Sequence, residues 1–251
     1  MQSKIYIRLK GGLGNQLFQY AFGLYLKNYG FSIEGYYADY SRDTYGHDYQ
    51  LHSIIPQAHI TVSKIPESTL LIQSENAEAI KSYILQKAPE CVLLEGYFQN
   101  VDYIEKSGLN QIIESKYNIN PLTAIHIRRG DYGHHGHLPV SYYTEALQTL
   151  GWPPFEIFSD EPNFSEYMFS NIPGFQRVIR PDLDNPAEEL IALASHASII
   201  MANSSFSWIA SYLAYKNHHS KIIYPKQWAF IGVAPGAYND WLGIDSDLIK
   251  P

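Results

Sequence analysis

The sequence has a single cysteine, Cys91, and lacks any long uninterrupted apolar run. One cysteine excludes an internal disulfide bond, so the chain suits a reducing compartment. No segment approaches the about 18 consecutive apolar residues of a membrane-spanning helix. The N-terminus also lacks the apolar core of a signal peptide. We therefore expect a cytoplasmic protein without a transmembrane segment.

Basic residues are few as well, because 18 lysines and arginines stand against 25 aspartates and glutamates, giving a formal net charge of −7. They form no basic block along the chain. Nucleic-acid binding requires a basic surface for the phosphate backbone, so we expect no nucleic-acid partner. The sequence has no Gly-x-Ser-x-Gly motif, and Cys91 lies in an apolar stretch, so covalent nucleophilic catalysis is not expected.

Tyrosine, in contrast, is abundant, with 21 residues. Tyrosine-rich surfaces often bind carbohydrate, because the ring packs on a sugar face while the hydroxyl forms hydrogen bonds. A generally tyrosine-rich composition explains the number equally well. The stretch His134-His135-Gly136-His137 suggests metal ligands, but no cysteine or carboxylate accompanies it at ligand spacing. We interpret it as a loop and expect no metal.

Stretches with the pattern of strands alternate with helix-like stretches along most of the chain. The first half has strand-like residues at 4–9, 31–37 and 91–94, and a helical pattern at 15–29. The second half has strand-like residues at 122–128, 155–159, 177–179, 198–202 and 221–224, and helical patterns from 185 onward and around 206–213. Residues 41–90 show little periodicity, and we expect loops with short helices there.

This alternation predicts the α/β class with parallel sheets. A boundary near residue 120 would give a Rossmann-like domain at 1–120 and a second at 121–230. We expect residues 231–251 to form a C-terminal segment that packs back on the first domain. Ligands of such sheets bind beyond the carboxyl ends of the strands, so the loops that follow strands are the candidate sites.

The first such loop is KGGLGNQ, residues 10–16. Gly12 and Gly14 are followed by Leu17 where a dinucleotide-binding motif would have its third glycine, so the signature is incomplete. The turn could present helix N–H groups, with Asn15 at the tip, to an anion or a sugar hydroxyl. The alternative is a plain glycine turn in which Asn15 caps the helix.

The second loop is HIRRGDY, residues 126–132. Strand alternation sends His126 and Arg128 to one side and Arg129 to the other. The guanidinium group is a planar donor suited to phosphate, and Asp131 could orient an arginine or accept a proton. The alternative is an internal ion pair between arginine and aspartate.

Two further loops follow strands in the second half. In FSDE, residues 158–161, the Asp160 carboxylate could bind the paired N–H donors of a guanine; the alternative is a solvated loop or a helix start. In ANSSFSW, residues 202–208, Ser204, Ser205 and Phe206 open a helix and could cradle phosphate; the alternative is plain helix capping. With the arginines, these loops predict a nucleoside-diphosphate site without an acidic magnesium motif.

The sequence resembles the α-1,2-fucosyltransferases of glycosyltransferase family 11. The matching segments, in the family's order, are GGLGNQLFQYAFGLYL (11–26), EGYFQN (95–100), HIRRGDY (126–132), FSDE (158–161), ANSSFSWIASYL (202–213) and YPKQW (224–228). The resemblance implies a GT-B-like pair of Rossmann-like domains facing each other across a cleft, GDP-β-L-fucose as donor, no metal and inversion at the anomeric carbon. It also matches Arg128 and Arg129 to the family's donor-binding pair, with His126 beside them.

The resulting hypothesis is transfer of L-fucose to a hydroxyl, O2 by expectation, of a terminal β-galactoside in a cell-surface glycan or oligosaccharide, as in lipopolysaccharide or capsule biosynthesis. The acceptor domain is the first and the donor domain the second, and a lipid-linked acceptor would bring the protein to the membrane surface. Arg128, Arg129 and the loop of Ser204, Ser205 and Phe206 would stabilise charge on the β-phosphate.

Other roles complete the hypothesis. His126 and Asp160 would hold guanosine, and Gly12 and Gly14 are further expected donor-binding residues. Asn15 would bridge donor and acceptor across the cleft, and Asp131 is a candidate base. Two alternatives stay open: a nucleotide-sugar-binding protein without transferase activity, and an NAD(P)-dependent oxidoreductase that uses the N-terminal turn.

Overall fold

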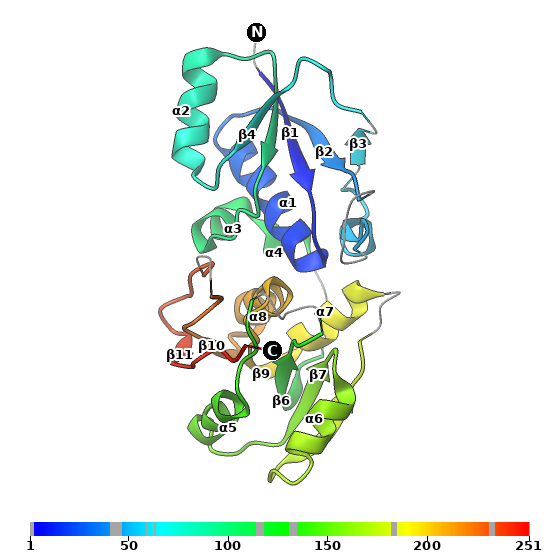
Figure 1. Ribbon diagram of the computed structural model, residues 1–251, viewed down its shortest axis with the longest axis vertical. Helices are drawn as coiled ribbons and strands as arrows, with labels where there is room; N and C mark the ends of the chain where they lie inside the picture. The colour runs from blue at the N-terminus through cyan, green and yellow to red at the C-terminus, as the bar shows by residue number, and fades with distance from the viewer. Residues whose placement is uncertain are drawn as a thin grey trace. The chain divides into compact units, whose positions relative to one another are not determined.

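The computed structural model describes residues 3–40, 47–58, 64–113, 118–130, 135–181, 185–230 and 234–250, and the backbone alone at 60–62. The chain divides into two compact units, Met1–Glu114 and Ser115–Pro251. Each is built on its own sheet, and the ladders between neighbouring strands are parallel in both (Figure 1). The predicted α/β class with parallel sheets is confirmed.

The first unit has a five-stranded sheet in the order β3-β2-β1-β5-β4. Its elements are β1 (Lys4–Leu9), α1 (Leu13–Asn28), β2 (Ile33–Ala38), a 3₁₀ turn (Leu51–Ser53), β3 (Ile60–Val62), β4 (Leu70–Gln73), α2 (Ala77–Lys87), β5 (Cys91–Glu95), α3 (Val101–Ser107) and α4 (Leu109–Ile112).

Close packing of α1 on the sheet forms the core of this unit. A side chain at Gly23 would collide with the Tyr36 hydroxyl and with Ile7, so glycine lets the helix approach β1 and β2. On its other side, α1 packs against α3, and the rings of Phe22 and Phe98 stack with centroids 4.0 Å apart. The position of β1 and the loop after it is therefore fixed by a fully packed helix.

The second unit has a six-stranded sheet in the order β11-β10-β9-β6-β7-β8. Read from β8, this is the Rossmann order, in which the first and fourth strands lie side by side at the centre. Its elements are β6 (Asn120–Ile127), α5 (Val140–Thr149), β7 (Phe155–Ser159), α6 (Pro162–Phe169), β8 (Phe175–Ile179), α7 (Pro186–Ala194), β9 (His196–Ile200), α8 (Ser205–His218), β10 (Lys221–Pro225) and β11 (Leu242–Ile244).

The C-terminal segment extends the second sheet. The described residues 234–250 belong to the second unit, and the expected packing of residues 231–251 on the first domain stays a prediction. They add β11 to the edge of its sheet beside β10, and Ile249 forms an antiparallel bridge with His137. The division between Glu114 and Ser115 lies a few residues before the expected boundary near 120.

Two parts of the first unit also differ from expectation. Helix α1 begins at Leu13, with Gly12 at the N-cap, rather than at Asn15. Within 41–90, where only loops and short helices were expected, β4 and the 11-residue α2 occur. The α2 helix is capped by Asn76, whose side chain accepts a hydrogen bond of 3.0 Å from the Ala79 amide.

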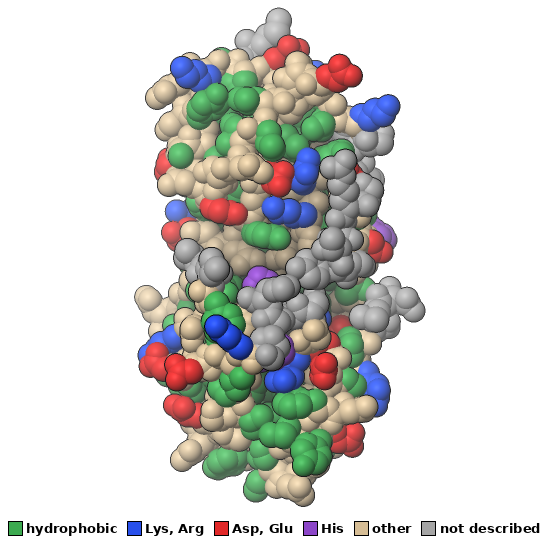
Figure 2. Space-filling model, viewed as in Figure 1, with side chains coloured by type: hydrophobic (Ala, Val, Ile, Leu, Met, Phe, Trp, Pro, Cys, Tyr) green, Lys and Arg blue, Asp and Glu red, His purple; other side chains and the backbone are tan. Residues whose placement is uncertain are grey.

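Charged side chains of both signs are interspersed over the face shown in Figure 2, without a field of one sign. Among the described helices, none combines the length and the apolar character needed to cross a bilayer.

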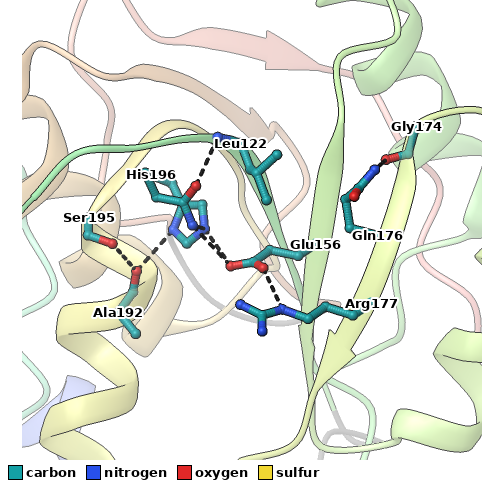
Figure 3. Close-up of polar contacts among 9 residues, drawn as sticks. Leu122, Glu156, Gly174, Gln176, Arg177, Ala192, Ser195 and His196 are labelled. Atoms are coloured by element: carbon teal, nitrogen blue, oxygen red, sulfur yellow. Dashed lines mark hydrogen bonds and ion pairs between the residues drawn. The ribbon is translucent and has the colours of Figure 1, made fainter.

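A polar cluster around the buried Glu156 carboxylate lies near the amino ends of the strands of the second sheet (Figure 3). The Glu156 carboxylate in β7 lies 2.8 Å from His196 Nε2 and accepts a hydrogen bond of 2.8 Å from Arg177 Nε. The other His196 nitrogen, Nδ1, lies 2.9 Å from the Ala192 carbonyl oxygen. This cluster links β7, β8 and β9 near the amino ends of their strands, whereas the predicted binding loops follow the carboxyl ends.

Candidate functional site

The second sheet has a topological switch point between β6 and β9. From β6 the chain proceeds to β7 and β8 on one side, and from β9 to β10 and β11 on the other. Connections at such a point diverge and leave a crevice outside the carboxyl ends of the two strands. Arg128 directly follows β6, and Ser204 lies four residues after the end of β9. Two of the predicted loops therefore meet at this crevice.

The two arginines lie in different surroundings. The His126 ring lies 5.7 Å from the Phe206 ring of α8, and the nearby Arg128 charge contributes to the lowered pKa of His126. Arg128 is therefore on the α8 side of the sheet. The Arg129 guanidinium instead lies 3.9 Å from the centre of the Phe164 ring in α6.

Asp160 holds the loop that carries the arginines. Its Oδ1 accepts a hydrogen bond of 2.9 Å from the Arg129 amide, and its Oδ2 accepts one of 3.0 Å from the Gly130 amide. The same Oδ2 lies 3.2 Å from Arg128 Nη1. These contacts show that Asp160 orients Arg128; its predicted binding of guanine stays a prediction. The predicted base, Asp131, lies outside the described residues.

His126 is a buried, uncharged group. Burial, together with the positive charge of Arg128, lowers its pKa from 6.5 to about 3. The imidazole is therefore neutral near pH 7 and cannot neutralise a phosphate by charge. Its Nδ1 is buried and has no hydrogen-bond partner within the described part of the chain.

The start of α8 is shaped for an anion. Ser204 occupies the N-cap position in extended conformation, and its side chain makes no capping hydrogen bond. The amides of Ser205, Phe206 and Ser207 have no acceptor within the helix, because the first turn leaves its N–H groups unpaired. These groups and the helix dipole together favour a negative charge. The Ser204 side chain therefore does not cap the helix, contrary to the alternative of plain helix capping.

Buried polar side chains hold this end of α8 and the arginine loop in place. Asn203 donates hydrogen bonds to the carbonyl oxygens of Gly136, at 3.1 Å, and Trp228, at 2.9 Å. His137 Nε2 lies 2.8 Å from the Arg129 carbonyl oxygen. The sequence pattern places His137 in a histidine-rich loop and does not distinguish Asn203 from the other residues of the 202–208 segment. No group of three or more His, Cys, Asp or Glu side chains among the described residues could hold a metal ion.

In the first unit, the predicted glycine turn is held by glutamines. Gly11 has φ of +72°, Gly12 precedes α1, and Gly14 is buried in the first turn. Gln16 Nε2 donates to the carbonyl oxygens of Gly11, at 2.9 Å, and Asp48, at 2.8 Å. Its Oε1 accepts from two amides at 50 and 51. Gln16 is thus a buried structural clamp.

Asn15, in the first turn of α1 just beyond the loop after β1, is bonded to the loop after β5. It does not cap α1, and its Oδ1 accepts a hydrogen bond of 2.7 Å from Gln99 Nε2. Gln19, one turn further along α1, links the same two loops, because it accepts from the Lys10 amide and donates to the Gly96 carbonyl oxygen. Sequence reasoning missed Gln16 and Gln19, although polar residues on a buried helix face were a visible signal.

Comparison with known proteins shows relatives along nearly the whole chain. No protein-family model matches it. The O-antigen biosynthesis glycosyltransferase WbnK of Escherichia coli is 27% identical over 287 residues, covering 89% of this chain and 94% of that protein. An alpha-1,2-colitosyltransferase of Escherichia coli is 28% identical over 277 residues, covering 90% of this chain and 92% of that protein.

Solved structures share the fold at low sequence identity. A mutant of Arabidopsis thaliana FUT1 in complex with GDP matches with a TM-score of 0.53 and 12% identity, covering 88% of this chain and 70% of that chain. A family 9 glycosyl transferase from Veillonella parvula matches with a TM-score of 0.51 and 10% identity, covering 98% and 88%.

The structural neighbours are GT-B glycosyltransferases, which confirms the predicted GT-B-like fold class. The sequence relatives are glycosyltransferases and indicate the same activity for this chain, with a nucleotide-sugar donor and a glycan acceptor.

Proposed function

We propose that this chain transfers L-fucose from GDP-β-L-fucose to O2 of a terminal β-galactoside, with inversion at the anomeric carbon. The family resemblance of the motifs suggests the donor. One relative is an alpha-1,2-colitosyltransferase, which supports a 1,2 linkage in the product. Another, WbnK, is an O-antigen biosynthesis glycosyltransferase, which supports an O-antigen glycan as acceptor. An O-antigen glycan is accordingly the acceptor that we propose.

The observation that carries this proposal is the pairing of Arg128 with the start of α8 at one switch point. As the bond to fucose breaks, negative charge accumulates on the β-phosphate of the leaving GDP. A guanidinium group and unpaired helix amides, held in place before the reaction, stabilise that charge without reorganising. One such charged donor is worth about 3 kcal/mol, or roughly a hundredfold in rate.

We assign the diphosphate contact to Arg128 rather than to Arg129. Arg128 shares the α8 side of the sheet with His126, and Asp160 braces its Nη1 at 3.2 Å. The Asp160 carboxylate fixes the direction of the guanidinium. Arg129, stacked on Phe164, then supports the loop and adds positive charge to the crevice.

The remaining groups fit a guanosine diphosphate. The Phe206 ring and the neutral His126 imidazole lie next to each other and form an uncharged wall beside the arginine. The amides at Ser205 and Phe206 take over the charge neutralisation that a metal provides in other enzymes, so we propose a reaction without metal. Asn15 remains the proposed link between donor and acceptor, and Asp131 the proposed base.

Product analysis tests this function. The purified protein is incubated with GDP-fucose and either lactose or N-acetyllactosamine, and the linkage in the product is determined by NMR. We expect an α-1,2-fucosylated galactose and stoichiometric release of GDP. Tight GDP binding by calorimetry without any transfer would instead support the alternative, a nucleotide-sugar-binding protein without transferase activity.

A further inference from the structure

The first sheet has a switch point of its own, between β1 and β5. The chain runs outward from β1 to β2 and β3, and β5 lies between β1 and the opposite edge strand β4. A ligand crevice is therefore expected beyond the carboxyl ends of β1 and β5 as well. Glu95 is the last residue of β5, and Lys10 directly follows β1.

A compact ionic cluster lies at this point. The Glu95 carboxylate lies 3.4 Å from Arg8 Nε through one oxygen and 3.5 Å from Lys10 Nζ through the other. Strand pairing sets Arg8 level with Tyr37 of β2, and Glu95 level with Gln73 of β4. These residues come from four neighbouring strands and the loop after β1. They lie along the carboxyl ends of the strands and are Arg8, Lys10, Tyr37, Gln73 and Glu95.

The cluster lies on the side of the sheet that α1 does not cover. Ile7 is fully buried and lies beside Gly23 of α1. Successive side chains of a strand point to opposite faces, so Arg8 lies on the other face. The side chains of Arg8 and Lys10 are about one-third exposed, and that of Glu95 is 16% exposed. A ligand in solution can therefore reach the carboxylate.

Aromatic rings flank these charges. The Lys10 ammonium lies 4.6 Å from the centre of the Tyr97 ring, and the Arg8 guanidinium lies 5.5 Å from that of Tyr37. Tyr97, two residues after Glu95, is 42% exposed. The combination of a ring face, a carboxylate and an ammonium is typical of sites that bind a sugar ring: the ring packs on its apolar face, and the charged groups bind its hydroxyls.

Stability alone does not account for this arrangement. Half-exposed ion pairs are worth about 0–1 kcal/mol each, so two cations on one carboxylate add little to folding. The two cations orient the Glu95 carboxylate, whose oxygens can accept hydrogen bonds from hydroxyl groups. Arg8 and Lys10 with Glu95 leave a net charge of +1, and the Glu75 carboxylate, which accepts a hydrogen bond from the Tyr97 amide, offsets it. The site therefore suits an uncharged ligand better than a phosphate.

We propose that Glu95, Lys10 and Tyr97 form a binding site for a pyranose ring of the acceptor glycan, flanked by Arg8 and Tyr37. Glu95 accepts hydrogen bonds from sugar hydroxyls, Lys10 donates to hydroxyl oxygens, and Tyr97 packs against the ring face. The proposal rests on the proposed transferase function and identifies the part of the first unit that selects the acceptor. It assigns no bond-breaking role to Glu95.

Steady-state kinetics of Glu95→Gln and Tyr97→Ala test this site, with GDP-fucose and N-acetyllactosamine varied separately. We expect each variant to raise the KM for N-acetyllactosamine about tenfold, corresponding to about 1.4 kcal/mol. The KM for GDP-fucose and kcat at saturating acceptor should stay within about twofold. Tyr97→Phe, which keeps the ring, should lose less acceptor affinity than Tyr97→Ala.

Glu34→Gln is the matched control. Glu34 is an exposed carboxylate near the amino end of β2, away from the switch point, so we expect unchanged kinetics. Thermal unfolding verifies that each variant is folded, and Tyr97→Ala removes an exposed ring that the core does not need.

The failure of this site can be told apart from the failure of the function. An unchanged acceptor KM in both Glu95→Gln and Tyr97→Ala, with normal donor parameters, would overturn the acceptor site alone. A raised KM for GDP-fucose in these variants would also overturn it, since it would assign the cluster to the donor. Absence of transfer and of GDP binding in the wild type would instead refute the proposed function.

Discussion

Arg128 and Arg129 are neighbours in sequence, yet the structure gives them separate tasks. Arg128 is braced by Asp160 on the side of α8, and Arg129 is stacked on Phe164 of α6. Strand alternation predicted their separation but could not identify which arginine lies toward the anion-binding helix. That depends on which helices cover each face of the sheet, and this follows from topology rather than from the motif.

This separation predicts unequal effects of mutation. Arg128→Ala should lower kcat about a hundredfold or more, because a charged donor to the leaving group is lost. Arg129→Ala should retain clearly more activity, since its guanidinium lies on the other side of the strand. Rates with GDP-fucose, measured for both variants after their folding is verified by circular dichroism, provide the comparison. The opposite ranking would contradict the assignment of the diphosphate to Arg128.

Strand β7 shows how one element can carry two polar functions at opposite ends. At its amino end, Glu156 is buried and bound by His196 and Arg177; beyond its carboxyl end, Asp160 holds the arginine loop. The sequence predicted β7 at its observed bounds, because the run is apolar apart from Glu156 and the final Ser159 and is bounded by Pro154 and a polar turn. The partners of Glu156 come from strands distant in sequence, so the buried cluster was not predictable.

Glu156 should make stability depend on pH. The hydrogen bond from His196, and then that from Arg177, hold its pKa below the ordinary glutamate value. The stabilisation is therefore present above the unfolded-state pKa of about 4.3 and is lost as pH falls through the lower folded-state value. We expect Glu156→Gln to lower the free energy of unfolding by about 3 kcal/mol at neutral pH, because it breaks a buried pair.

Arg177→Gln is the control for this prediction. The Arg177 side chain is 67% exposed, so its loss should cost less than about 1 kcal/mol. Urea unfolding of both variants and the wild type between pH 3 and 7 gives the comparison. If the wild type and Glu156→Gln lost stability in parallel on acidification, the linkage to Glu156 would be wrong.

At the scale of the whole molecule, the sequence was informative where elements are long and regular. Buried strands such as β1 and β7, and helices with clear periodicity such as α7, gave the α/β class and the two sheets. It failed at short edge elements: β11 has three residues and β4 has four, too few to show a period. Their place in the sheets is decided by pairing with distant strands, which no local pattern encodes.

Each of the two sheets has one topological switch point, and the residues at the two points differ in chemistry. The one in the second sheet combines Arg128 with unpaired helix amides, which suits a diphosphate. The one in the first sheet combines Glu95 with Tyr97 and Lys10, which suits a neutral sugar. Rossmann-like units of one chain thereby offer chemically different crevices, because the residues that follow the central strands differ.

Hydrogen exchange with and without GDP tests most directly where the donor nucleotide binds. We predict that GDP slows amide exchange in peptides covering 126–130 and 203–208, at the loop after β6 and the start of α8. We predict no comparable slowing in the glycine turn at 10–16. Protection confined to 10–16, with unchanged exchange at 126–130 and 203–208, would contradict the assignment of the donor to the second unit.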